Sequence, residues 1–313
     1  MHALTTANVT AAPRWRRAVL VIAVSLALAG CQTAASTSQT ASRPQAAAVQ
    51  VAALPALPAT TGAELALAPQ GSAQRRAHAA IVVDAATGTV LHEEDADSLR
   101  YPASLTKMMT LYLLFDALSE GRVSVDTPLV ISAKAASQPP ARIGLKIGGK
   151  LTVSQAIQAL AVKSANDVAI AVAENLAGSE AAFAAQMTAK ARSLGMRHTR
   201  FVNASGLPDP GQVTTARDMA ILSRALKSRH ASRASAFTAR SFSYEGRTYQ
   251  ATNNLLGRVA GVDGIKTGYI RDSGYNLAAS AHRGGRSVIA VVFGGESEGA
   301  RDRQVTELIE QYL

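Results

Sequence analysis

The sequence predicts an α/β fold of the α+β type, in which an antiparallel sheet is flanked by helices and carries a helical subdomain. Two patterns predict this class. Strand-like segments lie near both ends of residues 76–313, and long segments with helical periodicity occupy the middle. Hydrophobic residues make up 48% of the 313 residues, which is enough for a sizeable core. We therefore expect both ends of this segment to build one sheet, with the helices inserted between them.

The first elements of this segment are a hairpin and a helix. Residues 79–84 are an apolar run typical of a buried strand, residues 85–88 form a turn that ends in glycine, and residues 89–92 are a second strand. A helix is predicted over residues 104–118, because apolar side chains recur there with helical spacing just after Pro102.

The later elements follow from the same periodicities. Helical segments are predicted at residues 153–162, 165–176, 180–194 and 215–227, with a closing helix at 305–312. Strand signals return at residues 241–249, 264–270, 275–282 and 287–293. An Arg-Gly-Gly-Arg turn at residues 283–286 is expected to join the last two strands into a hairpin.

The N-terminal segment has the composition of an export signal. Residues 1–30 contain three arginines and no acidic residue, and they end in an apolar run too short to span a bilayer. The run closes with Leu-Ala-Gly-Cys, which resembles the bacterial lipobox, so Cys31 is expected to carry a lipid that anchors the protein to a membrane. Residues 31–75 are rich in small and polar residues and read as a flexible tether, which leaves residues 76–313 as the globular domain.

Composition narrows the function classes. Cys31 is the only cysteine, which excludes an internal disulfide framework and a thiolate metal cluster, and the six histidines lie far apart; no metal or cofactor is predicted. Aromatic residues make up only 4%, which argues against stacking on nucleic acid. The net charge of +10 instead favours anionic polymers of the cell envelope as partners.

The first of three short motifs is a Ser-x-x-Lys at the start of the predicted helix. Ser104 and Lys107 are three residues apart and share a helix face, so the amine can reach the hydroxyl. A desolvated, neutral lysine can serve as the base that a serine nucleophile needs. Taken alone, the motif is also typical of a capping serine beside a solvated lysine.

The other two motifs lie later in the chain. Ser164 and Asn166 form a Ser-x-Asn, in which the hydroxyl can relay a proton and the amide can hold a carbonyl and an ammonium; Ser164 is also suited to cap the next helix. Lys266, Thr267 and Gly268 lie on a predicted strand. The cation and the hydroxyl suit a carboxylate, and the glycine lets a substrate backbone approach the strand edge.

Together the motifs, spaced by 60 and then 102 residues, resemble the set of penicillin-binding enzymes. Their surroundings are similar to low-molecular-mass D-alanyl-D-alanine carboxypeptidases, the S11 serine peptidases, at residues 102–110, 163–167, 215–219, 263–269 and 273–277. The resemblance covers about residues 76–313. It implies that this segment is a D,D-peptidase catalytic domain with the serine β-lactamase/D,D-peptidase-like fold, also called the penicillin-binding transpeptidase fold.

The resemblance also implies catalytic roles. Ser104 would be the nucleophile that forms an acyl-enzyme, and Lys107 would be its general base. Lys107 would need a pKa lowered by burial and by the nearby Lys266. Ser164 would pass the proton to the leaving D-alanine, and Asn166 would orient the substrate peptide.

Substrate-binding residues are implied in the same way. Lys266 and Thr267 would bind the terminal carboxylate, beside the close-approach residue Gly268. The backbone N–H of Tyr269, together with that of the nucleophile, would form the oxyanion hole. Arg301 stands at about the place of the family's carboxylate-binding arginine, although its acidic neighbours depart from the pattern of some relatives.

The expected protein is thus a D-Ala-D-Ala carboxypeptidase that trims peptidoglycan stem pentapeptides on the periplasmic side of the envelope and is acylated by β-lactams. A D,D-endopeptidase that cuts peptidoglycan cross-links would use the same residues. A catalytically silent lipoprotein that binds peptidoglycan or senses β-lactams is a further alternative. A β-lactamase is disfavoured, because no Glu-x-x-Leu-Asn follows the second motif.

Overall fold

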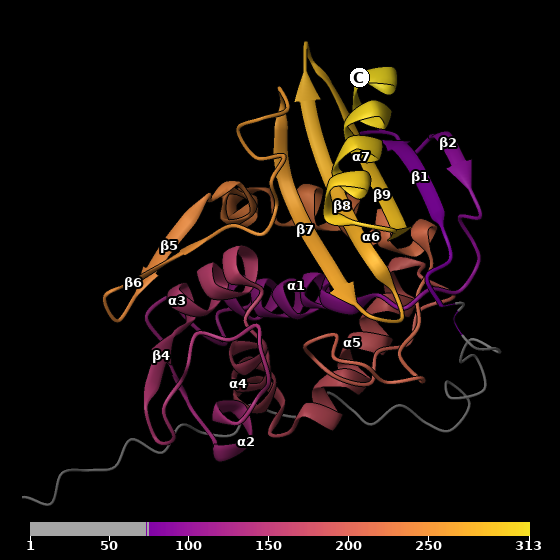
Figure 1. Ribbon diagram of the computed structural model, residues 1–313. Helices are drawn as coiled ribbons and strands as arrows, with labels where there is room; N and C mark the ends of the chain where they lie inside the picture. Colours follow the sequence, from indigo (N-terminus) through magenta and orange to yellow (C-terminus); the bar gives the residue numbers. More distant parts are fainter. Residues whose placement is uncertain (1–72, 74) are drawn as a thin grey trace, which may run out of the picture. The chain divides into compact units, whose positions relative to one another are not determined.

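The computed structural model describes residues 73 and 75–313, which belong to one compact unit. Its centre is a five-stranded antiparallel sheet with the strand order β2-β1-β9-β8-β7 (Figure 1). The strands are β1 (Ala79–Asp84), β2 (Val90–Glu94), β7 (Val262–Ile270), β8 (Gly274–Arg283) and β9 (Arg286–Gly295). The two ends of the described chain therefore build one sheet, as the sequence predicts.

Strand pairing explains how the ends meet. β1 pairs antiparallel with β9, from Ala79 opposite Phe293 to Asp84 opposite Val288. β8 and β9 form the predicted hairpin, whose turn glycines both have positive φ, as a tight two-residue turn requires. β7 pairs only with β8, so it forms one edge of the sheet.

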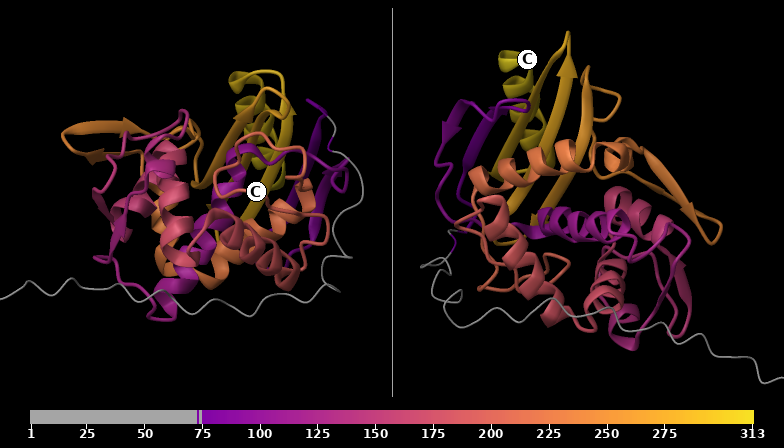
Figure 2. Two further views of the ribbon diagram at one scale, coloured as in Figure 1. Left: turned by 90° about the horizontal axis from the view of Figure 1, so that it is seen from below. Right: turned by 180° about the vertical axis from the view of Figure 1, so that it is seen from behind.

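Both faces of the sheet are covered by helices, as the two views of Figure 2 show. α7 (Glu298–Tyr312) packs against β8 and β9 on one face, and α6 (Ala216–Arg229) packs against β1 and β9 on the other. Side chains alternate between the two apolar clusters: Val82 lies in the cluster that contains α7, and Ile81 in the cluster that contains α6. Burial on both faces is why these strands have nearly continuous apolar runs.

A helical part lies between β2 and β7 in the sequence. It contains α1 (Thr106–Ser119), α2 (Ala133–Ala136), α3 (Val153–Gln158), α4 (Asn166–Ala177) and α5 (Glu180–Leu194). A 3₁₀ turn, η2 (Ala103–Leu105), precedes α1; a π-helical segment, η3 (Ala159–Lys163), follows α3; and a 3₁₀ segment, η4 (Ala231–Thr238), follows α6. No single helix of the described residues is long and apolar enough to cross a membrane, and only the pair α4–α5, bent by 85°, passes that test jointly.

Three details differ from the sequence prediction. The single strand expected at residues 241–249 is a separate hairpin of β5 (Ser241–Tyr244) and β6 (Arg247–Gln250), because Glu245 and Gly246 both adopt positive φ and turn the chain. The short strands β3 (Pro128–Val130) and β4 (Lys150–Thr152) had no recognisable pattern. The closing helix begins earlier than expected, at the Ser297 N-cap.

The predicted export signal, Cys31 and nearly all of the predicted tether lie outside the described residues. The fold class itself, an antiparallel sheet with flanking helices and a helical part, is confirmed.

Candidate active site

A cavity of about 560 Å³ lies between the β7 edge of the sheet and the helical part. Seven of the predicted site residues line it: Ser104, Ser164, Asn166, Thr267, Gly268, Tyr269 and Arg301. Lys107 and Lys266 lie close by but are fully enclosed, with 0% and 1% of their surface exposed. The structure thus brings together three motifs that the sequence separates by up to 162 residues.

The Ser-x-x-Lys pair is set by the junction of η2 and α1. Ser104 lies in the 3₁₀ turn and Lys107 one turn later in α1, so both side chains share one face. The Lys107 Nζ lies 3.1 Å from the Ser104 Oγ. The alternative of a capping serine beside a solvated lysine is wrong, because Ser104 makes no capping hydrogen bond and Lys107 is buried.

Lys107 has two further partners. Its amine donates to the Oδ1 of Asn166, 2.7 Å away, and to the backbone carbonyl of Ser205. Burial holds the pKa of Lys107 well below its usual range; the charge of Lys266 lowers the pKa further, and that of Asp167 opposes the shift. Such an amine is neutral over much of the pH range in which an ordinary lysine is charged.

Ser164 has an unusual backbone. It ends the π-helical segment η3 with φ 61° and ψ 39°, a left-handed conformation that few non-glycine residues adopt. Its Oγ is buried without a hydrogen-bond partner among the described residues, yet the residue lines the cavity. The expected helix cap is wrong, because α4 is capped by Ala165 without any side-chain bond. The hydroxyl is therefore available to a bound molecule.

Asn166 is fixed from both sides. Its Nδ2 donates to the carbonyl of Pro139 over 3.1 Å, and its backbone N–H donates to the carbonyl of Ala141 over 2.7 Å. The neighbouring Asp167, fully buried, accepts hydrogen bonds from three consecutive N–H groups, those of residues 143–145. This carboxylate ties the loop to the start of α4, so the loop forms one wall of the cavity.

The third motif lies on β7. Lys266 Nζ donates to the carbonyl of Thr267 at 3.0 Å, and burial, followed by the nearby charge of Arg301, lowers the pKa of Lys266 to about 7. The Thr267 hydroxyl donates to that of Thr252 at 2.7 Å. An amine and a hydroxyl therefore come from consecutive positions of this edge strand.

Two glycines allow the parts of the site to meet. A Cβ on Gly268 would lie 3.1 Å from the backbone N of Ser104, so β7 approaches η2 backbone to backbone. A Cβ on Gly206, whose φ is +84°, would lie 1.9 Å from the carbonyl oxygen of Ala103. Only glycine fits this second contact without movement of the chain.

Tyr269 and Arg301 also line the cavity. Tyr269 is 50% exposed, and its ring packs on that of Tyr275 with centroids 4.4 Å apart. Arg301 is 2% exposed, and its guanidinium pairs with Asp302 at 2.6 Å and with Glu298 at 3.6 Å. Arg301 thus lies in the site, but acidic neighbours share its charge.

Sequence reasoning missed three residues that hold the site together. Ser205 supplies the carbonyl that contacts Lys107, and Asn203 shapes that loop by accepting the N–H of Gly206 at 2.8 Å. Asn276, 0% exposed, donates to the carbonyl of Tyr101 at 3.2 Å and so ties β8 to the segment before the nucleophile motif. Only the position of Asn276 inside a family-like segment could have indicated it.

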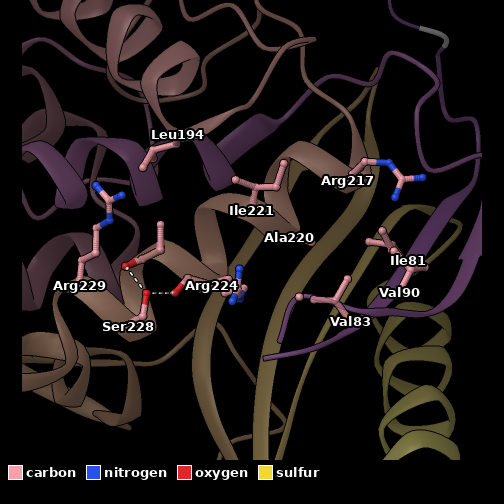
Figure 3. A pocket seen from close by; sticks show the side chains of 12 residues that line it. Ile81, Val83, Val90, Leu194, Arg217, Ala220, Ile221, Arg224, Ser228 and Arg229 are labelled. Atoms are coloured by element: carbon pink, nitrogen blue, oxygen red, sulfur yellow. Dashed lines mark hydrogen bonds between the residues drawn. The ribbon is translucent and has the colours of Figure 1, made fainter. Parts of the chain in front are cut away.

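A second cavity, of about 450 Å³, lies between α6 and the β1–β2 hairpin (Figure 3). None of the predicted site residues lines it. Of its three arginines, Arg217 is already paired with Asp97 and Glu93, and the bond to Asp97 raises the pKa of that guanidinium above its ordinary value. Arg224 donates to the backbone carbonyls of Ala85 and Ala86. The candidate active site is therefore the cavity at β7, which seven of the predicted site residues line. Within residues 73 and 75–313, no group of three or more histidine, cysteine or acidic side chains is placed to hold a metal ion.

Comparison with known proteins agrees with this geometry. The D-alanyl-D-alanine carboxypeptidase DacF of Bacillus subtilis (strain 168) is 35% identical over 238 residues, which are 75% of this chain and 61% of that protein. The crystal structure of penicillin binding protein 5 from Haemophilus influenzae superposes with a TM-score of 0.73 at 29% identity, over 76% of this chain and 71% of that one.

A third relative is nearly the same length as the described part. Penicillin-binding protein D2 from Listeria monocytogenes, in a cefotaxime-bound form, has a TM-score of 0.68 at 32% identity, and the match covers 77% of this chain and 98% of that one. The penicillin-binding fold expected from the sequence is therefore confirmed. The sequence model of the D-alanyl-D-alanine carboxypeptidase family, Peptidase S11, matches residues 66–297 of this chain. With that match over most of its length, the chain belongs to the Peptidase S11 family.

Proposed function

We propose that this protein is a serine-type D-Ala-D-Ala carboxypeptidase, which removes the terminal D-alanine of peptidoglycan stem pentapeptides through an acyl-enzyme on Ser104. The contact between Ser104 and Lys107 carries the proposal. A neutral amine has two N–H donors and one lone pair. The oxygens of Asn166 and Ser205 take the two donors, because neither oxygen has a hydrogen to give. The lone pair is then left for the hydroxyl of Ser104, 3.1 Å away.

The first half of the reaction follows from this arrangement. Lys107 takes the proton of Ser104 as the serine oxygen attacks the carbonyl carbon between the two D-alanines. The backbone N–H groups of Ser104 and Tyr269 stabilise the oxyanion. When the C–N bond breaks, the unpartnered hydroxyl of Ser164 passes a proton to the leaving amine, and Lys107 restores it.

Binding and the second half use the remaining groups. Lys266, Thr267 and Arg301 hold the carboxylate of the leaving D-alanine, while Asn166 orients the acyl side of the peptide. Water then attacks the ester carbonyl, Lys107 accepts its proton, and Ser104 leaves with that proton as a free hydroxyl. No step needs a cofactor.

The family supports the reaction type, while the chain spans 61% of the length of its Bacillus relative. The name of that relative states D-alanyl-D-alanine carboxypeptidase, and the Listeria relative is seen bound to cefotaxime, a β-lactam. Both observations support acylation of Ser104 by β-lactams, which imitate the D-Ala-D-Ala end.

Covalent labelling tests the proposal directly. The full chain, incubated with a fluorescent penicillin, should carry one covalent label and should release D-alanine from a pentapeptide. Ser104→Ala should carry no label, because no hydroxyl remains to form the ester. Ser119→Ala is the matched control: its hydroxyl bonds the Phe115 carbonyl at the end of α1, and the label should persist. An unlabelled wild type, or a labelled Ser104→Ala, would contradict the proposal.

Digestion of muropeptides distinguishes the exact cleavage. The carboxypeptidase should convert monomeric pentapeptides to tetrapeptides and leave cross-linked dimers intact, as mass spectrometry would show. Release of monomers from dimers would assign the endopeptidase activity instead.

The location of the protein is part of the same proposal. Residues 1–30 would direct export, lipid on Cys31 would anchor the chain, residues 31–75 would act as a tether, and residues 76–313 would work at the periplasmic side of the membrane. A lipobox cysteine with two acyl chains gives stable anchoring. Cys31→Ala should therefore move the protein from the membrane fraction to the soluble fraction, as fractionation with the fluorescent penicillin would show. Unchanged membrane association would contradict the lipid anchor.

A further inference from the structure

Lys163 is a cation of the cleft that no acidic side chain within residues 73 and 75–313 neutralises. The chain has eight lysines, all in that range. Four pair with carboxylates, namely Lys134, Lys146, Lys190 and Lys227. Two more, Lys107 and Lys266, are enclosed in the site. Of the remaining two, Lys150 lies on β4 outside the cavity, and Lys163 lines it.

Lys163 lines the cleft next to the second motif. It precedes Ser164 and is half-buried. The preceding residue, Val162, accepts a hydrogen bond at 3.2 Å from the N–H of Thr252, whose hydroxyl in turn accepts from Thr267 at 2.7 Å. This chain of contacts ties the end of η3 to the strand that carries the proposed carboxylate-binding groups.

The surroundings leave the amine of Lys163 in need of an anion. Its Nζ lies 5.8 Å from the centre of the Tyr249 ring, so an aromatic face replaces part of its water. The other charged side chains that line the cavity, Glu298 and Arg301, pair with each other at 3.6 Å. Lys163 is therefore an unpaired positive charge on a wall that the substrate would contact.

Resting on the proposed function, we propose that Lys163 is a specificity-determining residue that binds a second carboxylate of the substrate peptide, in addition to its C-terminal one. Two parts of a stem peptide could supply this group. One is an acidic side chain on the residue before D-Ala-D-Ala, as in diaminopimelate. The other is an acidic group on the leaving residue, as in a peptide joined to a neighbouring stem.

Three synthetic peptides separate these sources. The first carries L-lysine before D-Ala-D-Ala and has no second carboxylate. The second replaces that lysine by meso-diaminopimelate, and the third keeps the lysine but ends in D-glutamate. We would measure kcat and KM of each peptide with the full chain, with Lys163→Met and with the control Lys150→Met. Methionine keeps the apolar stem that packs beside Tyr249.

Lys163→Met should lower kcat/KM about fivefold for one diacidic peptide, mainly through KM, and change the lysine peptide less than twofold. The affected peptide identifies the source of the carboxylate. Lys163→Arg should restore most of the loss, and Lys150→Met should change nothing. Equal losses on all three peptides would show that Lys163 only packs against the β5–β6 hairpin, and this result would overturn the inference. The absence of any loss would overturn it as well. The proposed function has its own readout: it fails if the wild type cleaves none of the peptides and takes no penicillin label.

Discussion

The tasks proposed for the two enclosed lysines of the site need opposite charge states. Lys107 and Lys266 are both inside the protein, and burial is the largest cause of the lowered pKa of each. A base must be neutral to accept a proton, whereas a carboxylate-binding group must be charged. The task of Lys107 is therefore favoured above its lowered pKa, and that of Lys266 is favoured below a pKa of about 7.

The pH dependence of kcat/KM follows from these signs. Activity should rise with pH as Lys107 of the free enzyme loses its proton, and fall above about pH 7 as Lys266 becomes neutral. Lys266→Arg should move the falling limb to higher pH, because a guanidinium keeps its charge. Rates of D-alanine release, measured from about pH 5 to about pH 10, would check this profile. A wild-type profile that stays flat above pH 7 would contradict the role of Lys266.

Sequence alone could name the side chains of the site but not its backbone partners. Ser104 and Lys107 are recognisable because their spacing of three residues is local. The carbonyl of Ser205, 98 residues from Lys107, has no side-chain signature, since every residue has a carbonyl. The sequence could not predict that the Ser164 hydroxyl has no hydrogen-bond partner among the described residues, because a serine before a helix ordinarily caps that helix.

Three elements that lie far apart in the sequence converge on the proposed nucleophile. The 3₁₀ turn η2 carries Ser104, the edge strand β7 runs past it at Gly268, and the loop at residues 203–207 closes on it at Gly206. Because backbone meets backbone at both glycines, the geometry of the proposed oxyanion hole depends on the absence of two Cβ atoms.

Gly206→Ala should disturb the site far more than an ordinary glycine replacement. The new methyl would clash with the Ala103 carbonyl oxygen at 1.9 Å, so the loop or the turn must move, at a cost of about 1–3 kcal/mol beyond the strain of positive φ. The rate constant for penicillin acylation should fall at least tenfold (~1.4 kcal/mol of barrier), with a lower Tm.

Gly178→Ala is the matched control for this prediction. Gly178 ends α4 with a similar φ of 75°, but a Cβ there would meet nothing within 4 Å. This variant should lose only about 1 kcal/mol of stability and keep the wild-type acylation rate. Equal acylation by Gly206→Ala and wild type would contradict the proposed close approach.

Long, periodic elements were the ones the sequence could predict. The helices α4, α5 and α6 and the strands β7, β8 and β9 lie close to their expected positions, because each buries a continuous face. The three-residue strands β3 and β4 are too short for any period to show. The alternation predicts one strand where the β5–β6 hairpin lies, because the turn at Glu245-Gly246 interrupts that alternation by only two residues.

At the scale of the whole molecule, stability is expected to be uneven. β8 and β9 are central strands covered on both faces, with most of their residues buried. β5 and β6 pair only with each other, and most of their residues are exposed. Such a difference in burial and pairing gives different free energies of local opening.

Hydrogen exchange followed by mass spectrometry should resolve this difference. Amides of β8 and β9 should exchange only through global unfolding, whereas those of β5 and β6 should exchange at least about a hundredfold faster, because local opening of the hairpin suffices. Binding of a β-lactam should slow exchange in β7 more than in β2, the opposite edge of the sheet. Exchange in β5–β6 as slow as in β9 would contradict the independence of the hairpin.

The position of β7 at the edge of the sheet has a further consequence. An edge strand offers main-chain groups that no neighbouring strand satisfies, and in most proteins such an edge invites association with other chains. Here the same edge borders the cleft, where an extended peptide could add to the sheet as a temporary sixth strand. Covering this edge would protect the protein against aggregation, but it would also block the substrate. Because Ala141 and other residues of the helical part line the same cavity, we expect them to hinder a second folded sheet from pairing with this edge.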